Sequence, residues 1–365
     1  MTRPTQARLN LRALRHNFAL AAQLAPRSRI IAVVKANAYG HGALSIACQL
    51  APLADALAVA CIEEAQALRG GGIASPILLL QGVFDAAELD TAAQLDLWLT
   101  IDSERQMQWL ERAKPAAPLH CWLKLDTGMH RLGFDADNLD EAIHLLNENP
   151  QLEVRSIFSH LAGSEATEHD TFTLDQVARF EALYERLAAA LGYRPLRHIL
   201  NSSGIIRFPQ YQMDMVRLGI GAYGIDAAGL VQDQLRTVLT LRARISQVKH
   251  LLPGDTVSYG RSGVIRRPSR IATVSIGYAD GLPRAAGNGR FSLLVRGQRA
   301  PIIGNVCMDM CMIDITHIPQ AAEGDEVVVF GAEPTAEELA RAIGTIPYEV
   351  FTSVSPRVRR VYVQE

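Results

Sequence analysis

Residues 29–42 read RIIAVVKANAYGHG, and this stretch decides how the rest of the chain is interpreted. An apolar run from Ile30 to Val34 leads directly into Lys35, and small and turn-forming residues follow it. A short, continuously apolar run of this kind is typical of a strand in a parallel sheet that is buried on both faces. We therefore expect Lys35 at the carboxyl end of a buried strand.

Further runs with the same character follow, separated by amphipathic stretches such as Glu63–Arg69 and Thr171–Leu191. Strands that alternate with helices predict a parallel sheet, and eight such units close into a barrel of about 200 residues or more. The sequence thus predicts an α/β fold in which a (β/α)8 TIM-like barrel comes first. The eight runs are Arg29–Lys35, Ala56–Ile62, Pro76–Leu80, Leu95–Thr100, His120–Asp126, Val154–Leu161, Arg197–Ser203 and Met213–Ile220.

The pattern changes beyond residue 232, where strand-like runs such as Leu239–Leu251 are divided by turns rich in glycine, proline and aspartate. One late helix is expected over Thr335–Ile343, with Thr335 as its cap and Glu338 as the capping-box partner. We therefore expect a cofactor-binding barrel over residues 7–232 and a mostly-β C-terminal domain over residues 233–365. Residues 1–6 are not assigned to the barrel and could join the second domain.

Composition limits the classes of protein to consider. The chain has 365 residues, of which 48% are hydrophobic, and a formal net charge of −2. A chain so close to neutral has no electrostatic reason to bind nucleic acid or an anionic membrane. No apolar run approaches the length of a bilayer span, and the N-terminal residues lack a secretory hydrophobic block. Five scattered cysteines form neither a disulfide framework nor a zinc site. These features predict a cytoplasmic protein without a metal.

Polar residues gather where the predicted strands end, which is the edge of a barrel that carries active sites. Lys35 follows a continuously apolar strand, where burial away from water is expected to lower the pKa of its amine. The neutral amine is nucleophilic enough to form a Schiff base with an aldehyde. Ser202, Gly219 and Gly221 lie at the ends of the last two strands and offer a phosphate cradle. Together they point to pyridoxal 5′-phosphate as the cofactor. Taken singly, Lys35 could cap a strand in solvent, and the glycines could be packing positions.

Arg217 lies on the last predicted strand, from which it could reach the cofactor's pyridine nitrogen. A permanently cationic guanidinium there would keep that nitrogen unprotonated and weaken the ring as an electron sink. We then expect a short-lived carbanion and little leakage into transamination. The alternative is an interior arginine paired with a carboxylate.

The sequence resembles the alanine racemase family over essentially its whole length. Residues 33–42, VVKANAYGHG, are similar to the family's cofactor-attachment signature. The resemblance implies an isomerase that interconverts L-alanine and D-alanine, for peptidoglycan supply or for D-alanine breakdown. It also implies a homodimer in which the β domain of one subunit completes the barrel site of the other. Further matches are Lys124–Gly133, Asn201-Ser202, Val216–Gly221, Val257–Gly260, Gly277–Gly281 and Gly304–Asp309.

The resemblance implies two catalytic bases. Lys35 would carry the cofactor and remove the α-hydrogen of D-alanine, while Tyr259, lent by the partner subunit, would serve L-alanine. Racemisation takes a proton from one face and returns it to the other, so one base on each face meets the need. A tyrosine has an unperturbed pKa of about 10. By similarity, a chain of contacts from Tyr259 through His160 to Arg217 would favour the phenolate.

Other roles follow from the same resemblance. Tyr39, Ser202, Gly219 and Ile220 would hold the phosphate, Arg131 would touch the cofactor's phenolic oxygen, and Met308 of the partner would contact the substrate carboxylate. Tyr278 and Asp309 are similar to residues that line the substrate entrance and the inner site. Besides Lys35, the residues expected to bind the cofactor are Tyr39, Arg131, His160, Asn201, Ser202, Arg217, Gly219 and Ile220.

Lys124 follows the family, whereas Pro356 departs from it. Lys124 matches a lysine that is N-carbamylated (N6-carboxylysine) in many members, which would turn its amine into an anion able to orient Arg131. Pro356 departs from the family, since many relatives have a tyrosine there that binds the phosphate and narrows the entrance. A proline has no hydroxyl, so that contact is missing here or supplied elsewhere.

Four other functions compete with this interpretation. A pyridoxal-phosphate decarboxylase of the same architecture needs no second base, so the match at Val257–Gly260 favours the racemase. Broad-specificity amino-acid racemases are usually exported, whereas no signal peptide is recognised in this sequence. A non-catalytic cofactor carrier is generally a barrel alone, and the residues beyond position 232, which include Tyr259, argue against it. A Schiff-base aldolase without cofactor would leave Arg217 and the phosphate cradle unexplained.

Overall fold

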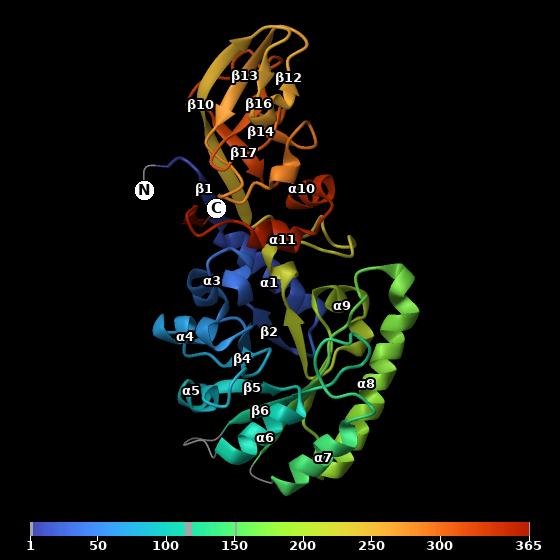
Figure 1. The fold of residues 1–365 in the computed structure, drawn as a ribbon. Coiled ribbons are helices and arrows are strands. Elements are labelled where there is room, and N and C mark those ends of the chain that lie inside the picture. Colours follow the sequence, from blue (N-terminus) through green and yellow to red (C-terminus); the bar gives the residue numbers. More distant parts are fainter. Residues whose placement is uncertain (1–2, 114–118, 150–151, 365) are drawn as a thin grey trace. The chain divides into compact units, whose positions relative to one another are not determined.

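The computed structural model describes residues 3–113, 119–149 and 152–364. These residues fall into two compact units (Figure 1). The barrel unit comprises Leu14–Ala38 and Ala43–Arg236, and the β unit comprises Met1–Ala13, Tyr39–Gly42 and Thr237–Glu365. The expected domain ranges also include residues 1–2, 114–118, 150–151 and 365, which lie outside the described residues.

Parallel strands form the centre of the barrel unit. In sheet order they are β8 (Leu196–His198), β7 (Val154–Phe158), β6 (His120–Lys124), β5 (Leu97–Ile101), β4 (Ile77–Leu79), β3 (Ala56–Val59), β2 (Arg29–Val33) and β9 (Met215–Leu218). The two end strands also meet, because Asp214 N–H donates to the Arg197 carbonyl at 3.1 Å and Arg217 N–H donates to the Leu200 carbonyl at 3.0 Å. The sheet is therefore closed, and the described residues confirm the predicted barrel of eight parallel strands.

Burial explains why these strands read as continuous apolar runs. Every residue of β3 is buried, and so is every residue of β2 except Arg29. Buried side chains pack together among the strands, where the Phe158 and His198 rings stack with their centroids 4.9 Å apart. The barrel is a packed core, as its fold class requires, so ligand chemistry is left to the strand ends.

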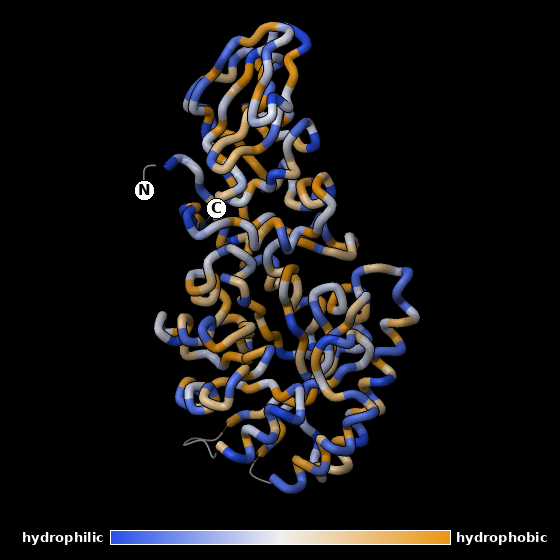
Figure 2. Tube along the Cα trace, in the orientation of Figure 1, coloured by the Kyte–Doolittle hydropathy of each residue, from blue (hydrophilic) through white to orange (hydrophobic). Residues whose placement is uncertain are grey.

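Helices lie around the strands of this unit. They are α1 (Leu11–Leu24), α3 (Ala43–Leu50), α4 (Ile62–Gly70), α5 (Glu88–Gln94), α6 (Glu104–Ala113), α7 (Leu139–Glu148), α8 (Asp170–Leu191) and α9 (Ser202–Arg207). In α8, residues at helical spacing such as Phe180, Tyr184 and Leu187 are buried, and Figure 2 shows polar and apolar residues alternating along it. None of the described helices combines the length and apolar character needed to cross a membrane.

The β unit is built on an eight-stranded sheet that takes in both ends of the described chain. Its main order is β15 (Gln298–Pro301), β14 (Ser292–Val295), β17 (Glu326–Phe330), β10 (Leu239–Leu251), β1 (Gln6–Asn10) and β18 (Arg359–Val363), and β13 (Ser269–Val274) joins β10 to β16 (Cys311–Asp314). The first half of β10 alternates buried and partly buried residues, the pattern of a strand with one face in a core. Because β1 pairs with β10 and β18, the N-terminal strand belongs to this sheet.

Short helices complete the β unit. The hydroxyl of Thr335 accepts a hydrogen bond from the N–H of Glu338 at 3.1 Å, which confirms the predicted cap of α10 (Ala336–Ile343). The helix ends at Gly344, whose φ of 76° suits a residue without a Cβ. α11 (Pro347–Thr352) follows at once, with a proline in its first turn.

Candidate active site

Lys35 lies just beyond the carboxyl end of β2, after the buried residues Val33 and Val34. Burial lowers the pKa of Lys35, the nearby cation Arg131 lowers it further, and the carboxylate of Glu64 opposes both. Burial acts in this direction because it penalises the ammonium and leaves more of the neutral amine. The neutral amine is the form that attacks an aldehyde.

A left-handed turn, α2 (Lys35–Tyr39), carries the chain onward from this lysine. Each residue from Ala36 to Tyr39 has a φ between 52° and 54°, and none of them is glycine. Such a conformation costs about 1–2 kcal/mol per residue, so the surroundings must hold it. The carboxylate of Glu64 accepts from the N–H groups of Ala36 at 2.6 Å and Ala60 at 2.8 Å, tying together the ends of β2 and β3. The backbone at Lys35 is therefore held by the β2 strand before it and by the hydrogen bond from Ala36 to Glu64 after it.

The loops after β8 and β9 meet around the hydroxyl of Ser202. This buried hydroxyl accepts from the N–H groups of Gly219 at 2.9 Å and Gly221 at 3.3 Å, so its own proton is left to donate. A Cβ on Gly221 would lie 3.1 Å from Leu218 and 3.6 Å from Ser202, so a larger residue would crowd the loop. Asn201 caps α9 by accepting from Gly204 N–H at 2.9 Å. A hydroxyl donor beside a glycine loop suits the phosphate of the expected cofactor.

Arg217, on β9, is fully enclosed, and among the described residues its hydrogen bonds go to carbonyl oxygens and histidine nitrogens and not to a carboxylate. It donates to the carbonyl of Ser159 at 2.6 Å and to Nδ1 of His160 at 3.0 Å, and it also bonds Nδ1 of His198 and the carbonyl of Ile199. Burial and then Arg131 lower the pKa of Arg217 to about 9, so it stays cationic at neutral pH. All the acceptors are neutral, which leaves this charge uncompensated and available to a ligand.

His160 lies just beyond the carboxyl end of β7 and accepts a hydrogen bond from this arginine. Burial and the Arg217 charge hold the pKa of His160 well below its usual range, so its ring is neutral. Because Nδ1 accepts from Arg217, the proton of the neutral ring sits on Nε2. His160 can therefore donate from Nε2 to an oxygen placed beyond it, which is the polarity that a phenolate requires.

Further cations gather around the end of β6. Lys124 is buried, and burial followed by Arg131 and Arg217 lowers the pKa of Lys124 to about 8. Burial raises the pKa of the neighbouring Asp102, while Lys124 opposes that rise. Arg131 sits on the loop that leaves β6 and returns at Phe134, whose N–H donates to the Lys124 carbonyl at 2.9 Å. Asp102 and Asp126 oppose the effect of these cations on Lys124 without reversing it, so the cluster favours an anionic ligand or an anionic modification.

Tyr39 belongs to the β unit, where it is buried beside Tyr348 with the ring centroids 6.0 Å apart. Burial and the Tyr348 hydroxyl raise the pKa of Tyr39 far above its usual value. Its hydroxyl stays protonated and so remains a hydrogen-bond donor. The next residue, Gly40, has a φ of +79°, and a Cβ there would lie 2.1 Å from the Phe351 carbonyl oxygen.

The other expected site residues of the β unit lie on three neighbouring segments. Tyr259, Tyr278 and Met308 are 72%, 42% and 53% exposed, which is unusual for such large side chains. The segments are joined by bonds from Tyr278 N–H to the Cys307 carbonyl at 3.0 Å and from Asn305 to the Tyr259 carbonyl at 2.9 Å. The β unit thus presents a phenol and a thioether together on its surface.

The structure thus brings Lys35, Lys124, Arg131, His160 and Arg217 into one electrostatic cluster of the barrel unit. Two residues that the sequence did not single out also belong to it, Glu64 and His198. His198 had a detectable signal, because it is a polar residue inside the predicted run Arg197–Ser203. Glu64 had none, because a glutamate in the first turn of a helix is ordinary.

Comparisons with known proteins cover nearly the whole chain. The alanine racemase N-terminal domain family matches residues 9–227, and the alanine racemase C-terminal domain family matches residues 238–362. The chain is 43% identical to an alanine racemase of Stutzerimonas stutzeri, covering 99% of both chains, and 42% identical to a catabolic alanine racemase of Pseudomonas putida, covering 100% of both.

Solved structures give the same result. The biosynthetic alanine racemase from Pseudomonas aeruginosa superposes with a TM-score of 0.91 at 39% identity, covering 99% of this chain and 100% of that one. The alanine racemase from Bacillus anthracis with bound L-Ala-P superposes with a TM-score of 0.90 at 31% identity, covering 100% of this chain and 96% of that one.

Proposed function

The chain belongs to the alanine racemase family, and from that premise we propose how its own residues interconvert L-alanine and D-alanine. The reaction removes the α-hydrogen from one face of the substrate and returns a proton to the other. The enzyme is an isomerase, and like the rest of the family it depends on pyridoxal phosphate.

The residues at the barrel mouth fit this cofactor. Lys35 offers an amine with a lowered pKa, and the Ser202 hydroxyl contacts the loop at Gly219 and Gly221. Arg217 brings a buried cation that bonds no carboxylate among the described residues. When bound, pyridoxal phosphate supplies the aldehyde that joins the substrate amine and the conjugated ring that acidifies the α-hydrogen. Lys35 would hold it covalently, the phosphate would be held by Tyr39, Ser202, Gly219 and Ile220, and Asn201 would also bind the cofactor.

Proton transfer is assigned to two side chains. Lys35 takes the α-proton of D-alanine or returns it to that face, and Tyr259 of the partner subunit does the same on the L-alanine face. The neutral tautomer of His160, held by Arg217 at 3.0 Å, supports this proposal because it can donate to a tyrosine oxygen and stabilise the phenolate. The 72% exposure of Tyr259 supports a role toward another copy of the chain.

Arg217 also explains how side reactions are limited. A guanidinium directed at the pyridine nitrogen would stop that nitrogen from gaining a proton, because the two positive charges would repel. Arg217 would thereby favour return of the proton to the substrate carbon over side reactions such as transamination. The neutral acceptors around Arg217 support this, since they leave its charge undiminished.

Substrate recognition is assigned to the cationic loop and to the exposed β-unit face. Met308 of the partner would contact the substrate carboxylate, and Arg131 would contact the cofactor's phenolic oxygen and help to bind the substrate. Tyr278 and Asp309 would line the substrate entrance and the inner site. We further propose that Lys124 carries an N-carboxyl group. The positive cluster around Lys124 supports that proposal, since an anion there would balance Arg131.

The same assignment implies a homodimer that shares its two sites between subunits. We also propose a cytoplasmic location. The five unpaired cysteines support it, because thiols stay reduced there.

The observation that carries the proposal is the Lys35 amine held beside Arg131 and Arg217 at the end of a buried strand. Purified protein should absorb near 420 nm, roughly where a lysine-bound pyridoxal absorbs, and borohydride should abolish that band. It should convert L-alanine to D-alanine in a coupled D-amino-acid oxidase assay, and Lys35→Ala should lose both properties. Racemisation by Lys35→Ala would refute the attachment site, and carbon dioxide release from an amino-acid panel would favour the decarboxylase.

A further inference from the structure

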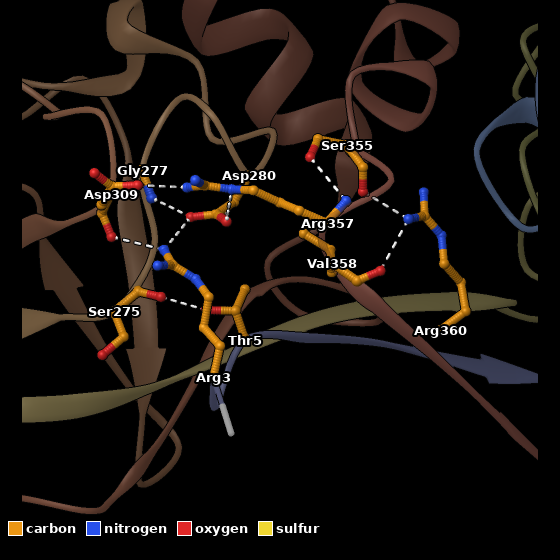
Figure 3. Close-up of polar contacts among 10 residues, drawn as sticks. All are labelled: Arg3, Thr5, Ser275, Gly277, Asp280, Asp309, Ser355, Arg357, Val358 and Arg360. Carbon is orange, nitrogen blue, oxygen red and sulfur yellow. Dashed lines mark hydrogen bonds and ion pairs between the residues drawn. The ribbon is translucent and has the colours of Figure 1, made fainter. Parts of the chain in front are cut away.

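Two arginines from opposite ends of the chain meet one buried carboxylate in the β unit (Figure 3). Asp280 is 0% exposed and accepts from Arg3 Nη2 at 2.6 Å, Arg357 Nε at 2.8 Å and Gly277 N–H at 2.9 Å. Both of its oxygens are engaged by cations. A buried carboxylate would be costly without such partners, so the two arginines are what permits this aspartate to be there.

The same arginines reach a second segment. Arg357 Nη2 donates to Oδ1 of Asp309 at 2.7 Å, and Arg3 Nη2 donates to the Asp309 carbonyl at 2.9 Å. Bonding to Asp280 and Asp309 raises the pKa of Arg357 above its usual value. The turn at Gly277–Gly281 and the segment around Asp309 are therefore joined by two independent bridges.

These two segments carry Tyr278 and Met308. Direct backbone bonds already pair them, from Tyr278 N–H to Cys307 and from Ala279 N–H to Met308, both at 3.0 Å. A Cβ on Gly277 would lie 2.3 Å from the carbonyl oxygens of both Cys307 and Met308, so the segments touch as closely as backbones can. Small displacements of either arginine bridge would therefore move both exposed side chains.

The third part of the arrangement is the segment 355–357. The N–H of Ser355 donates to the Asp280 carbonyl at 3.2 Å, and the hydroxyl of Ser355 accepts from Arg357 N–H at 3.2 Å. Pro356 lies between these two residues. Arg357, the residue that follows Pro356, is thus held by both Asp280 and Asp309.

We propose that Arg357 and Arg3 are positioning residues for the substrate entrance: through Asp280 and Asp309 they fix where Tyr278 and Met308 stand. This rests on the proposed function, in which those two side chains meet the substrate. Neither arginine is a catalytic residue. Arg3 thus gives the N-terminal segment, which no sequence motif singles out, a role in positioning the entrance. The contacts of Arg357 likewise help to set the affinity for alanine.

The test compares Arg357→Gln, Arg357→Lys and Arg3→Gln in the full-length holoenzyme. The control is Arg296→Gln, which breaks an exposed ion pair with Asp325 elsewhere in the β unit. Arg357→Gln and Arg3→Gln should each raise the KM for alanine about tenfold, the equivalent of one charge-assisted hydrogen bond, while kcat changes less than about threefold. Arg357→Lys should recover part of the loss, because its ammonium can reach one of the two carboxylates.

A second measurement does not depend on activity. Amide hydrogen exchange of peptides covering 277–281 and 307–310 should be faster in Arg357→Gln and Arg3→Gln than in wild type or Arg296→Gln. Unchanged KM in both variants would overturn the proposal, even with faster exchange, because the arginines would then be merely structural. A wild-type protein without racemase activity would sink the proposed function instead. If Arg357→Gln does not fold, Arg3→Gln and Arg357→Lys decide the matter.

Discussion

At the scale of single residues, the barrel mouth is governed by unbalanced positive charge. Lys35, Lys124 and Arg217 each have a lowered pKa, and Arg131 contributes to all three shifts. Glu64 is the carboxylate that opposes this trend at Lys35. A site of this kind increases the neutral fraction of its amines and attracts anions, and both effects favour covalent attachment of a phosphorylated aldehyde.

The pKa of Lys35 should move in opposite directions in two variants. Arg131→Gln removes a cation, which stabilises the ammonium and raises the pKa, whereas Glu64→Gln removes an anion and lowers it. The measurement is the rate at which cofactor-free protein binds pyridoxal phosphate covalently, followed by absorbance as a function of pH. That rate rises with pH as the amine loses its proton. Glu63→Gln, at an exposed neighbour of Glu64, is the matched control and should leave the profile unchanged.

Lys124 should take up carbon dioxide. Carboxylation needs the neutral amine, and a pKa of about 8 leaves a useful fraction neutral at neutral pH. Carbon-13 NMR of protein in labelled bicarbonate should show a carbamate signal that Lys124→Met lacks. That variant should also lose about tenfold in kcat/KM, the cost of one charge-assisted hydrogen bond. A signal that persists in Lys124→Met would assign the modification to another lysine.

The unmodified lysine has its own signature in stability. Because its folded pKa of about 8 lies below the ordinary 10.5, the unfolded chain binds more protons between those values. Stability of carbon-dioxide-free protein should therefore rise as pH increases across that interval, and it should rise less steeply in Lys124→Met, where other groups with a lowered pKa, such as Lys35 and Arg217, still contribute. The measurement is the urea midpoint at a series of pH values.

At the scale of elements, the left-handed turn α2 is the most strained part of the site. Four successive non-glycine residues have positive φ, and Glu64 and Asn37 hold the turn through hydrogen bonds to Ala36, Ala60 and Ala43. Strain of this kind persists only where the surroundings over-determine it. Here it fixes the backbone at the lysine that must attack.

Replacing Ala36 with glycine should stabilise the fold by up to about 1 kcal/mol, because glycine adopts positive φ without a steric penalty. The matched control is Ala182→Gly on the exposed side of α8, which should destabilise by about 1 kcal/mol. Urea unfolding of the two variants gives both numbers. If both destabilise equally, the turn is not strained.

At the scale of the whole molecule, the two proposed bases lie in different units. Lys35 belongs to the barrel unit, and Tyr259 lies on the exposed surface of the β unit. A closed dimer in which each β unit serves the other barrel would use that surface twice. Such an assembly has a consequence that a monomeric site does not share.

Two inactive variants should restore each other. Lys35→Ala and Tyr259→Phe chains, mixed and allowed to exchange subunits, should regain about a quarter of wild-type activity, since half the dimers are mixed and each has one intact site. Each variant alone should stay inactive for L-alanine. No recovery after verified subunit exchange would place both bases in one subunit.

The sequence alone determined the barrel, the β domain that follows it and the strand ends that bear Lys35 and Arg217. It could do so because apolar periodicity and glycine-rich turns are local features of a chain. The helix cap at Thr335 was predictable for the same reason. The resemblance to a family added the roles of Tyr259, Met308 and Lys124, which no spacing would have suggested.

Only the tertiary structure decided which side chains hold these residues in place. Glu64 joins two strand ends, His198 shares Arg217 with His160, and Arg3 reaches Asp280 across 277 positions of sequence. The burial that lowers the pKa of Lys35 is likewise a product of packing. Local pattern specifies whether a residue is buried, but the partner of a buried charge depends on how distant segments close around it.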